Sequence, residues 1–130
     1  MKQFPGMQEQ DVRSCLGRFG LTGTTALQPI GTLSGGQKSR TVFAWMSLKN
    51  PHVLILDEPT NHLDMDSIEA LSKALIQFKG GVLIVSHDQM FLDSCCNEIW
   101  VCNNKQLSKF VGKEGDQHGI VHQYKKSLLA

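Results

Sequence analysis

Residues 53–64, VLILDEPTNHLD, place an unbroken aliphatic run directly before two carboxylates. Because the run is short and does not alternate with polar residues, we expect residues 53–57 to form a parallel strand covered on both faces. A second aliphatic run, Val82 to Val85, follows Gly80 and Gly81, and the segment between the runs has helical spacing. The pattern predicts a β–α–β unit and an α/β fold with a parallel sheet core.

The helices beside the first strand have recognisable starts. Ser34 fits a helix N-cap with Gln37 three residues later, and the Asn-Pro pair at 50–51 ends that helix. We expect Asp66 to cap the helix of the β–α–β unit, with Glu69 in the matching position. Its apolar face comprises Ile68, Leu71, Leu75 and Phe78.

The rest of the chain also shows regular patterns. Residues 12–19 have helical spacing, and a third amphipathic segment starts at Asp88. Residues 98–111 alternate around an Asn-Asn-Lys turn and predict a hairpin. Residues 119–130 predict a closing helix that uses Ile120, Tyr124 and Leu128.

Composition limits the possible functions. With 130 residues, 41% hydrophobic, the chain can bury one core, and its net charge of +1 gives no reason to expect base-specific nucleic-acid contact or an anionic membrane surface. The aliphatic runs are too short to span a bilayer, and the N-terminus lacks the apolar stretch of a signal peptide, so a cytoplasmic location is expected. Without C-x-x-C spacing, the cysteines are expected to be free and mostly buried: Cys15, Cys95, Cys96 and Cys102.

Three polar side chains follow the two predicted strands. Asp57 and Glu58 end the first strand, and His87 lies just beyond the second. Because parallel neighbours place their carboxyl ends on one edge of the sheet, we expect the three to converge there. Asp57 suits Mg²⁺, Glu58 can orient or deprotonate a water, and His87 can contact a terminal phosphate. A solvated strand end and a surface turn are the alternative readings.

The turn Ser34-Gly35-Gly36-Gln37 has the features of an anion site. It opens a helix, so its N–H groups and the helix dipole point outward, and the glycines allow a phosphate to approach. The Ser34 hydroxyl can either cap the helix or bond a phosphate oxygen. Alone, the turn is equally well explained as a capped helix start.

In combination, residues 33–37, 53–64 and 85–88 resemble the signature motif, the Walker B and D-loop segment and the switch histidine of an ABC-type ATPase. Residues 33–40 and 85–93 narrow the resemblance to the ABC-F family, and most closely to the second ATPase domain of its eukaryotic members. These proteins are soluble, usually carry two ATPase domains, and mostly act on ribosomes in translation or its control.

The resemblance implies a role for each matching residue. Ser34, Gly35, Gly36 and Gln37 would contact the ATP of an opposing domain in a head-to-tail pair. Asp57 would be the Walker B carboxylate that holds Mg²⁺, Glu58 the catalytic base, Asp64 the D-loop aspartate and His87 the switch. The implied partners are another ABC nucleotide-binding domain and the ribosome or a translation factor, with no membrane contact.

No Gly-x-x-x-x-Gly-Lys-Ser/Thr phosphate loop occurs in the sequence; residues 17–25 have glycines but no lysine. We therefore expect an incomplete P-loop NTPase domain, inactive in isolation: residues 1–50 as part of the helical signature subdomain, 51–111 as the core and 112–130 as a tail helix. The alternatives are a non-catalytic interaction module that regulates a complete ATPase, and a truncated product without activity of its own.

Overall fold

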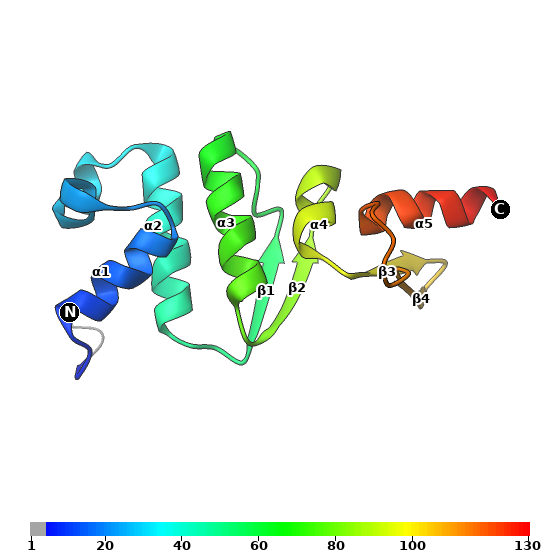
Figure 1. The fold of residues 1–130 in the computed structure, drawn as a ribbon, viewed down its shortest axis with the longest axis horizontal. Coiled ribbons are helices and arrows are strands. Elements are labelled where there is room, and N and C mark those ends of the chain that lie inside the picture. Colours follow the sequence, from blue (N-terminus) through cyan, green and yellow to red (C-terminus); the bar gives the residue numbers. More distant parts are fainter. Residues whose placement is uncertain (1–4) are drawn as a thin grey trace. The chain divides into compact units, whose positions relative to one another are not determined.

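The computed structural model describes residues 5–130, which form two compact units that meet at the Val85–Ser86 bond (Figure 1). The first contains α1 (Glu9–Arg18), η1 (Gly23–Leu27), η2 (Ile30–Thr32), α2 (Gly35–Leu48), β1 (Val53–Asp57), α3 (Met65–Gln77) and β2 (Gly81–Val85). The second contains α4 (Gln89–Cys95), β3 (Glu98–Asn103), β4 (Gln106–Val111) and α5 (Ile120–Leu129). This division falls inside the expected 51–111 core segment, and the functional subdivision of the chain stays a prediction.

The first unit is built on the expected β–α–β unit. Strands β1 and β2 pair in parallel, from Val53 opposite Gly81 to Asp57 opposite Val85, and α3 connects them. Since β1 and β2 run in the same direction, their carboxyl ends lie at one edge of the sheet. Figure 1 shows that α2 and α3 both start at this same end of the unit.

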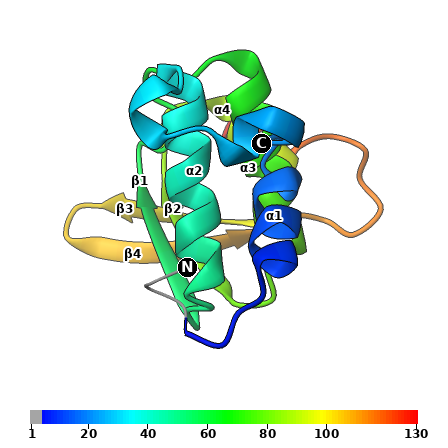
Figure 2. The same ribbon diagram turned by 90° about the vertical axis from the view of Figure 1, so that its left-hand side faces the viewer.

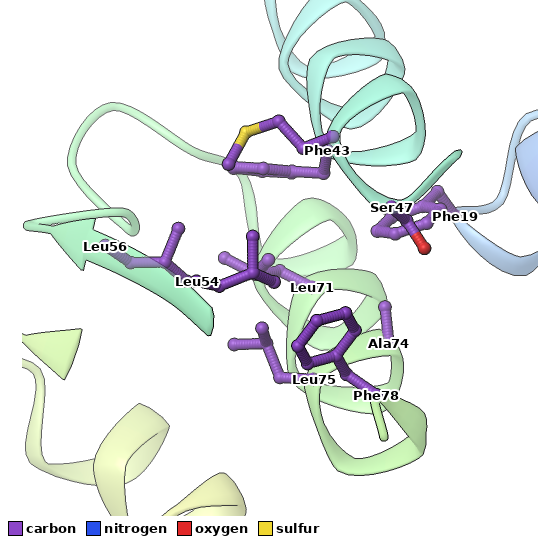
Figure 3. A pocket seen from close by; sticks show the side chains of 10 residues that line it. Phe19, Phe43, Ser47, Leu54, Leu56, Leu71, Ala74, Leu75 and Phe78 are labelled. Atoms are coloured by element: carbon purple, nitrogen blue, oxygen red, sulfur yellow. The ribbon is translucent and has the colours of Figure 1, made fainter. Parts of the chain in front are cut away.

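Helices α2 and α3 bury one face of the sheet. Leu56 of β1 and Leu71 and Leu75 of α3 are buried, and Phe43 of α2 lines the same small apolar cavity (Figure 3). Helix α1 packs beside α2 through Cys15 and Phe19 against Ala44 (Figure 2), and Phe19 also lines the same cavity. The core of this unit is therefore a stack of helices on one sheet face.

The expectation that β1 is covered on both faces was wrong. Val53 and Ile55 are 57% and 70% exposed, and Val85 in the neighbouring strand is 53% exposed. Successive side chains of a strand point to opposite faces, and within this unit the helices pack on the face that carries Leu54 and Leu56. The continuous apolar run thus has one buried and one exposed side.

The predicted cap of α3 was also wrong. Helix α3 starts at Met65, and Asp64, not Asp66, is the N-cap, with its carboxylate accepting a hydrogen bond from Ser67 N. Asp66 lies in the first turn, where its charge still suits the helix dipole. Glu69, expected to complete a capping box, instead forms an ion pair with Lys73 one turn later.

The second unit confirms the predicted helix from Asp88, the hairpin and the closing helix, but Leu128, expected on the packed face of the closing helix, is 65% exposed. Asp88 caps α4 by accepting a hydrogen bond from Phe91 N, and β3 and β4 pair antiparallel around Asn104 and Lys105. Both turn residues have positive φ values, 49° and 60°, as in the two-residue hairpin turns whose twist matches the right-handed twist of the flanking strands. Helix α5 is fixed to α4 because Asp93 Oδ1 accepts a 2.6 Å hydrogen bond from Val121 N.

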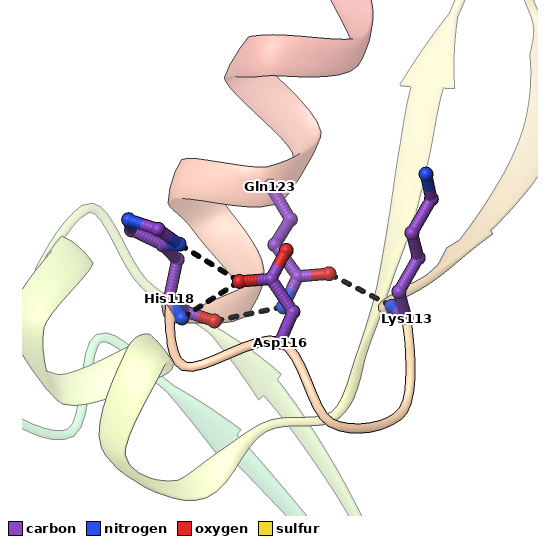
Figure 4. Close-up of polar contacts among 4 residues, drawn as sticks. All are labelled: Lys113, Asp116, His118 and Gln123. Atoms are coloured by element: carbon purple, nitrogen blue, oxygen red, sulfur yellow. Dashed lines mark hydrogen bonds and ion pairs between the residues drawn. The ribbon is translucent and has the colours of Figure 1, made fainter.

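The loop between β4 and α5 is held by side chains of the loop and of α5 (Figure 4). Gln123 accepts a hydrogen bond from Lys113 N and donates one to the carbonyl of His118. Asp116 Oδ1 accepts a hydrogen bond from His118 N and lies 2.8 Å from its Nδ1. The bonds from the His118 backbone and ring lower the pKa of Asp116. The loop therefore has a defined conformation at the start of α5.

Two further features concern the described residues as a whole. None of their helices is long and apolar enough to cross a membrane. Their cysteines are free, as predicted, but only Cys15 is buried: Cys95 and Cys96 are partly exposed and Cys102 is exposed. The expectation of mostly buried thiols was wrong because three of the four cysteines lie in the second unit, on or beside the short α4 and on the hairpin.

Replacing Leu71 by Ala is expected to lower the free energy of unfolding by about 2–5 kcal/mol, because this side chain is 2% exposed and its removal leaves a cavity. Ile76→Ala on the same helix is the matched control. Because Ile76 is 62% exposed, this substitution should change the free energy of unfolding by about 0.5 kcal/mol or less. Urea titration followed by circular dichroism measures both. Equal losses would contradict the assigned core.

Candidate functional site

The first part of the site is the end of β1. Asp57 is the last residue of the strand and is exposed, and the Glu58 N–H extends the ladder by donating a 2.7 Å hydrogen bond to Val85 O. Glu58 has a φ of 46°, in the left-handed region that non-glycine residues rarely adopt. The chain thus leaves the sheet abruptly here, and both carboxylate residues lie at the edge where open α/β sheets bind ligands.

The second part is the turn that opens α2, where the predicted capping box is confirmed. Ser34 Oγ accepts a 3.2 Å hydrogen bond from Gln37 N, and Gln37 Oε1 accepts one of 3.0 Å from Ser34 N. Within the described residues, this leaves the first-turn N–H groups of Gly35 and Gly36 available. The Ser34 hydroxyl caps the helix as an acceptor and still has its own proton to donate.

The start of α3 lies directly against this turn. Asp64 Oδ1 accepts a 2.9 Å hydrogen bond from Ser67 N, and the fully buried Ser67 hydroxyl lies 3.5 Å from Gly36 O. A Cβ atom at Gly36 would be 2.9 Å from both Asp64 Oδ2 and Ser67 Oγ, closer than real Cβ contacts allow. Glycine at position 36 is therefore what permits the two helix N-termini to meet.

The electrostatics of this junction favour an ionised Asp64. Hydrogen bonds from the Ser67 hydroxyl and then the Ser67 N–H lower the pKa of Asp64, and the positive charge of Arg40 acts in the same direction. Arg40 Nε is buried without a hydrogen-bond partner among the described residues. The junction thus combines one carboxylate and one guanidinium beside the first turn of α2.

His87 belongs to the second unit, two residues beyond the end of β2, and is exposed. Its neighbours hold the turn: Asp88 N donates a 3.0 Å hydrogen bond to Ser86 Oγ, and Asp88 caps α4. The structure therefore fixes the local backbone around His87. Its convergence with Asp57 and Glu58 stays a prediction.

The donors at the end of β1 fit a hydrated cation. The described residues contain no group of three or more histidine, cysteine, aspartate or glutamate side chains placed to hold a metal. A cation at Asp57 would consequently take its other ligands from water and phosphate oxygens. Magnesium accepts such a site, because it is bound by one or two carboxylates and keeps part of its hydration shell.

Known proteins with similar sequences match almost the whole chain. A family described as ABC transporter matches residues 3–61. An uncharacterized ABC transporter ATP-binding protein of Schizosaccharomyces pombe is 54% identical over 99% of this chain and 17% of its own length. ABC transporter F family member 3 of Arabidopsis thaliana is 48% identical over 98% of this chain and 17% of its own length. Protein GCN20 of Saccharomyces cerevisiae is 50% identical over 98% of this chain and 16% of its own length.

This chain belongs to the ABC-F family of ABC-type ATPases. It spans about a sixth of the length of these relatives.

Two solved structures share the fold of this ABC-F chain. One is a dimeric ATP-binding cassette in a post-hydrolysis state bound to ADP and phosphate, with a TM-score of 0.60 and 23% identity over 85% of this chain and 51% of that chain. The other is an ATP-binding subunit of an ABC transporter, with a TM-score of 0.64 and 22% identity over 93% of this chain and 56% of that chain. The ABC-F chain therefore has part of the α/β architecture of an ABC ATPase domain.

Sequence reasoning missed two residues at the junction of this ABC-F chain. Ser67 connects Asp64 to Gly36, and Arg40 places a positive charge near Asp64. Aspartate is a preferred N-cap residue, and a cap at Asp64 places Ser67 at the position whose N–H the carboxylate accepts. No local pattern marks Arg40, since its proximity to Asp64 depends on how α2 packs against α3.

We expect the stability of the ABC-F chain to depend on the ionisation of Asp64. Because folding lowers the pKa of this carboxyl below 3.8, its stabilising effect is complete above that value and is lost as the pH falls through the folded pKa. Asp64→Ser keeps a capping oxygen that does not titrate. From about pH 5 to about pH 2, the free energy of unfolding should therefore fall more in the wild type than in Asp64→Ser.

Urea unfolding at several pH values measures this difference. Asp66→Ser, which changes a carboxylate in the first turn of the same helix without removing the cap, is the matched control and should stay closer to the wild type than Asp64→Ser does. Parallel pH profiles for the wild type and Asp64→Ser would contradict the role given to the cap.

Proposed function

We propose that this chain supplies the signature, Walker B, D-loop and switch parts of an ATP-hydrolysing domain, the second in an ABC-F protein that acts on the ribosome or a translation factor in the cytoplasm. One observation carries the ATPase part of the proposal. The start of α2 contacts the start of α3 at Gly36, and both helices start at the end of the unit where β1 delivers Asp57 and Glu58. The translation part rests on the family alone.

In this proposal the residues at the end of β1 serve the domain's own ATP. Asp57 holds Mg²⁺, which supplies charge neutralisation at the phosphates. Glu58, directed by its left-handed backbone, orients the attacking water and accepts its proton. His87 contacts the terminal phosphate through an imidazole N–H. Phosphoryl transfer needs this positioning and charge stabilisation more than any covalent nucleophile.

The α2 turn serves the ATP of an opposing ABC domain in a head-to-tail pair. Its capping box holds the first turn in one conformation, so that the N–H groups of Gly35 and Gly36 and the Ser34 hydroxyl are ready to donate to phosphate oxygens. Asp64 caps α3 by accepting from Ser67 N, and the Ser67 hydroxyl holds the start of α3 against the α2 turn by its contact with Gly36 O. The dimeric cassette with the same fold supports pairing as the working state of such domains.

The two halves of this proposal fail differently when altered in a complete domain pair. Glu58→Gln keeps the shape of the side chain but removes the basic carboxylate, so ATP should bind and hold the pair closed while turnover falls by about 10²–10⁴-fold. Ser34→Arg adds bulk and charge at a helix start packed against α3, so it should prevent closure over nucleotide. Phosphate release and nucleotide-dependent association of the two domains are measured side by side.

Matched controls are Glu114→Gln and Ser127→Arg, which make the same changes at exposed positions of the second unit and should leave both readouts unchanged. Unchanged single-site turnover in Glu58→Gln, or intact closure in Ser34→Arg, would overturn the assigned roles. Loss of association with normal partner turnover would instead support the alternative, a non-catalytic module that regulates a complete ATPase.

A further inference from the structure

Two adjacent thiols lie at the end of α4, outside the residues assigned to nucleotide chemistry. Cys95 is the last residue of the helix and Cys96 is its C-cap, and both are free and partly exposed. The Cys95 thiol donates a hydrogen bond to the carbonyl oxygen of Phe91, at a distance of 3.1 Å. Two thiols of consecutive residues are thus within reach of small reagents at the end of α4.

Their contact makes the two thiols chemically unequal. The hydrogen bond from Cys95 stabilises a thiolate at Cys96, which lowers the pKa of Cys96, while the same contact and burial raise the pKa of Cys95. Burial and, less strongly, the negative charge of Asp93 oppose the lowering of the Cys96 pKa but do not reverse it. Because the thiolate is the reactive form of cysteine, Cys96 is the first nucleophile of the pair and Cys95 the second.

Geometry disfavours a direct disulfide between them. Adjacent α-carbons are about 3.8 Å apart across a trans peptide, whereas disulfides most often join α-carbons about 5.5–6 Å apart. A single soft atom bonded to both sulfurs keeps the sulfurs separated and avoids this strain. A zinc cage is also disfavoured, since no third histidine, cysteine, aspartate or glutamate joins the pair among the described residues.

We propose that Cys95 and Cys96 form a chelating dithiol site for a trivalent organoarsenical, a soft electrophile that takes two thiolates. With an arsenoxide, each sulfur forms one arsenic–sulfur bond, the arsenic–oxygen bond breaks, and the oxygen leaves as water with the two thiol protons. Arsenic remains trivalent, so no oxidant or reductant is required. Because the arsenic–sulfur bond replaces the Cys95 thiol proton, binding removes the hydrogen bond to the Phe91 carbonyl.

The chain contains its own single-thiol comparison. Cys102 is exposed on β3 without a second thiol next to it in sequence, and Cys15 is fully buried, where its thiol donates to the carbonyl of Ala44. A lone thiol forms only one bond to arsenic, and an excess of another monothiol displaces it. A chelate held by two sulfurs of one chain resists such displacement, because the second bond is intramolecular.

The test treats the folded 130-residue chain with phenylarsine oxide and measures intact mass in the presence of excess glutathione. We expect one glutathione-resistant adduct per chain, which a small dithiol such as dimercaptopropanol removes. Cys95→Ser and Cys96→Ser should each abolish the resistant adduct, and Cys102→Ser should retain it. Proteolysis of the wild-type adduct should place arsenic on the peptide that contains Cys95 and Cys96, whether or not the serine variants fold.

Two results would overturn the proposal. One is a resistant adduct that persists in Cys96→Ser or maps to a peptide without the pair. The other is a wild-type adduct that glutathione removes as readily as it removes the adduct of Cys95→Ser.

Discussion

The close contact between the first turns of α2 and α3 is the constraint on which the proposed site depends. At Gly36 there is no room for a side chain, because Asp64 and Ser67 occupy the space where a Cβ atom would lie. The same Asp64 carboxylate caps α3, so one residue both starts a helix and limits what can stand opposite it. Two segments some thirty residues apart in sequence are thereby fixed against each other.

The sheet contributes the second half of the site through backbone geometry. Parallel pairing of β1 with β2 brings their carboxyl ends to one edge, and the left-handed Glu58 ends β1 with a sharp turn. A non-glycine residue in this conformation costs roughly 1–2 kcal/mol, which the hydrogen bond from Glu58 N to Val85 O helps to offset. Strain held at this position is consistent with a functional role for Glu58, because such residues concentrate at active sites.

Local signals in the sequence were sufficient for most of the elements and for the capped turn that opens α2. The Ser34–Gln37 capping box and the Asn-Lys hairpin turn depend on neighbours within a few residues, and both were confirmed. The parallel pairing of residues 53–57 with the second aliphatic run was also confirmed, because two aliphatic runs separated by a helical segment favour a β–α–β unit. The errors concern choices between similar local signals or burial by distant elements. Asp64 and Asp66 are both plausible caps, and the exposure of Ile55 depends on which sheet face the helices cover. The Gly36 contact required the packing of two helices and had no local signature.

A double-mutant cycle at position 36 tests the central claim most directly. In the wild type, Gly36→Ala should lower the free energy of unfolding by about 1–3 kcal/mol, because the new methyl group meets Asp64 and Ser67. In an Asp64→Ala/Ser67→Ala background the same change should be nearly neutral or stabilising, with a coupling energy of about 0.5–3 kcal/mol. Gly35→Ala, one residue away with open space around it, should show no such coupling. Equal effects of Gly36→Ala in both backgrounds would contradict the account.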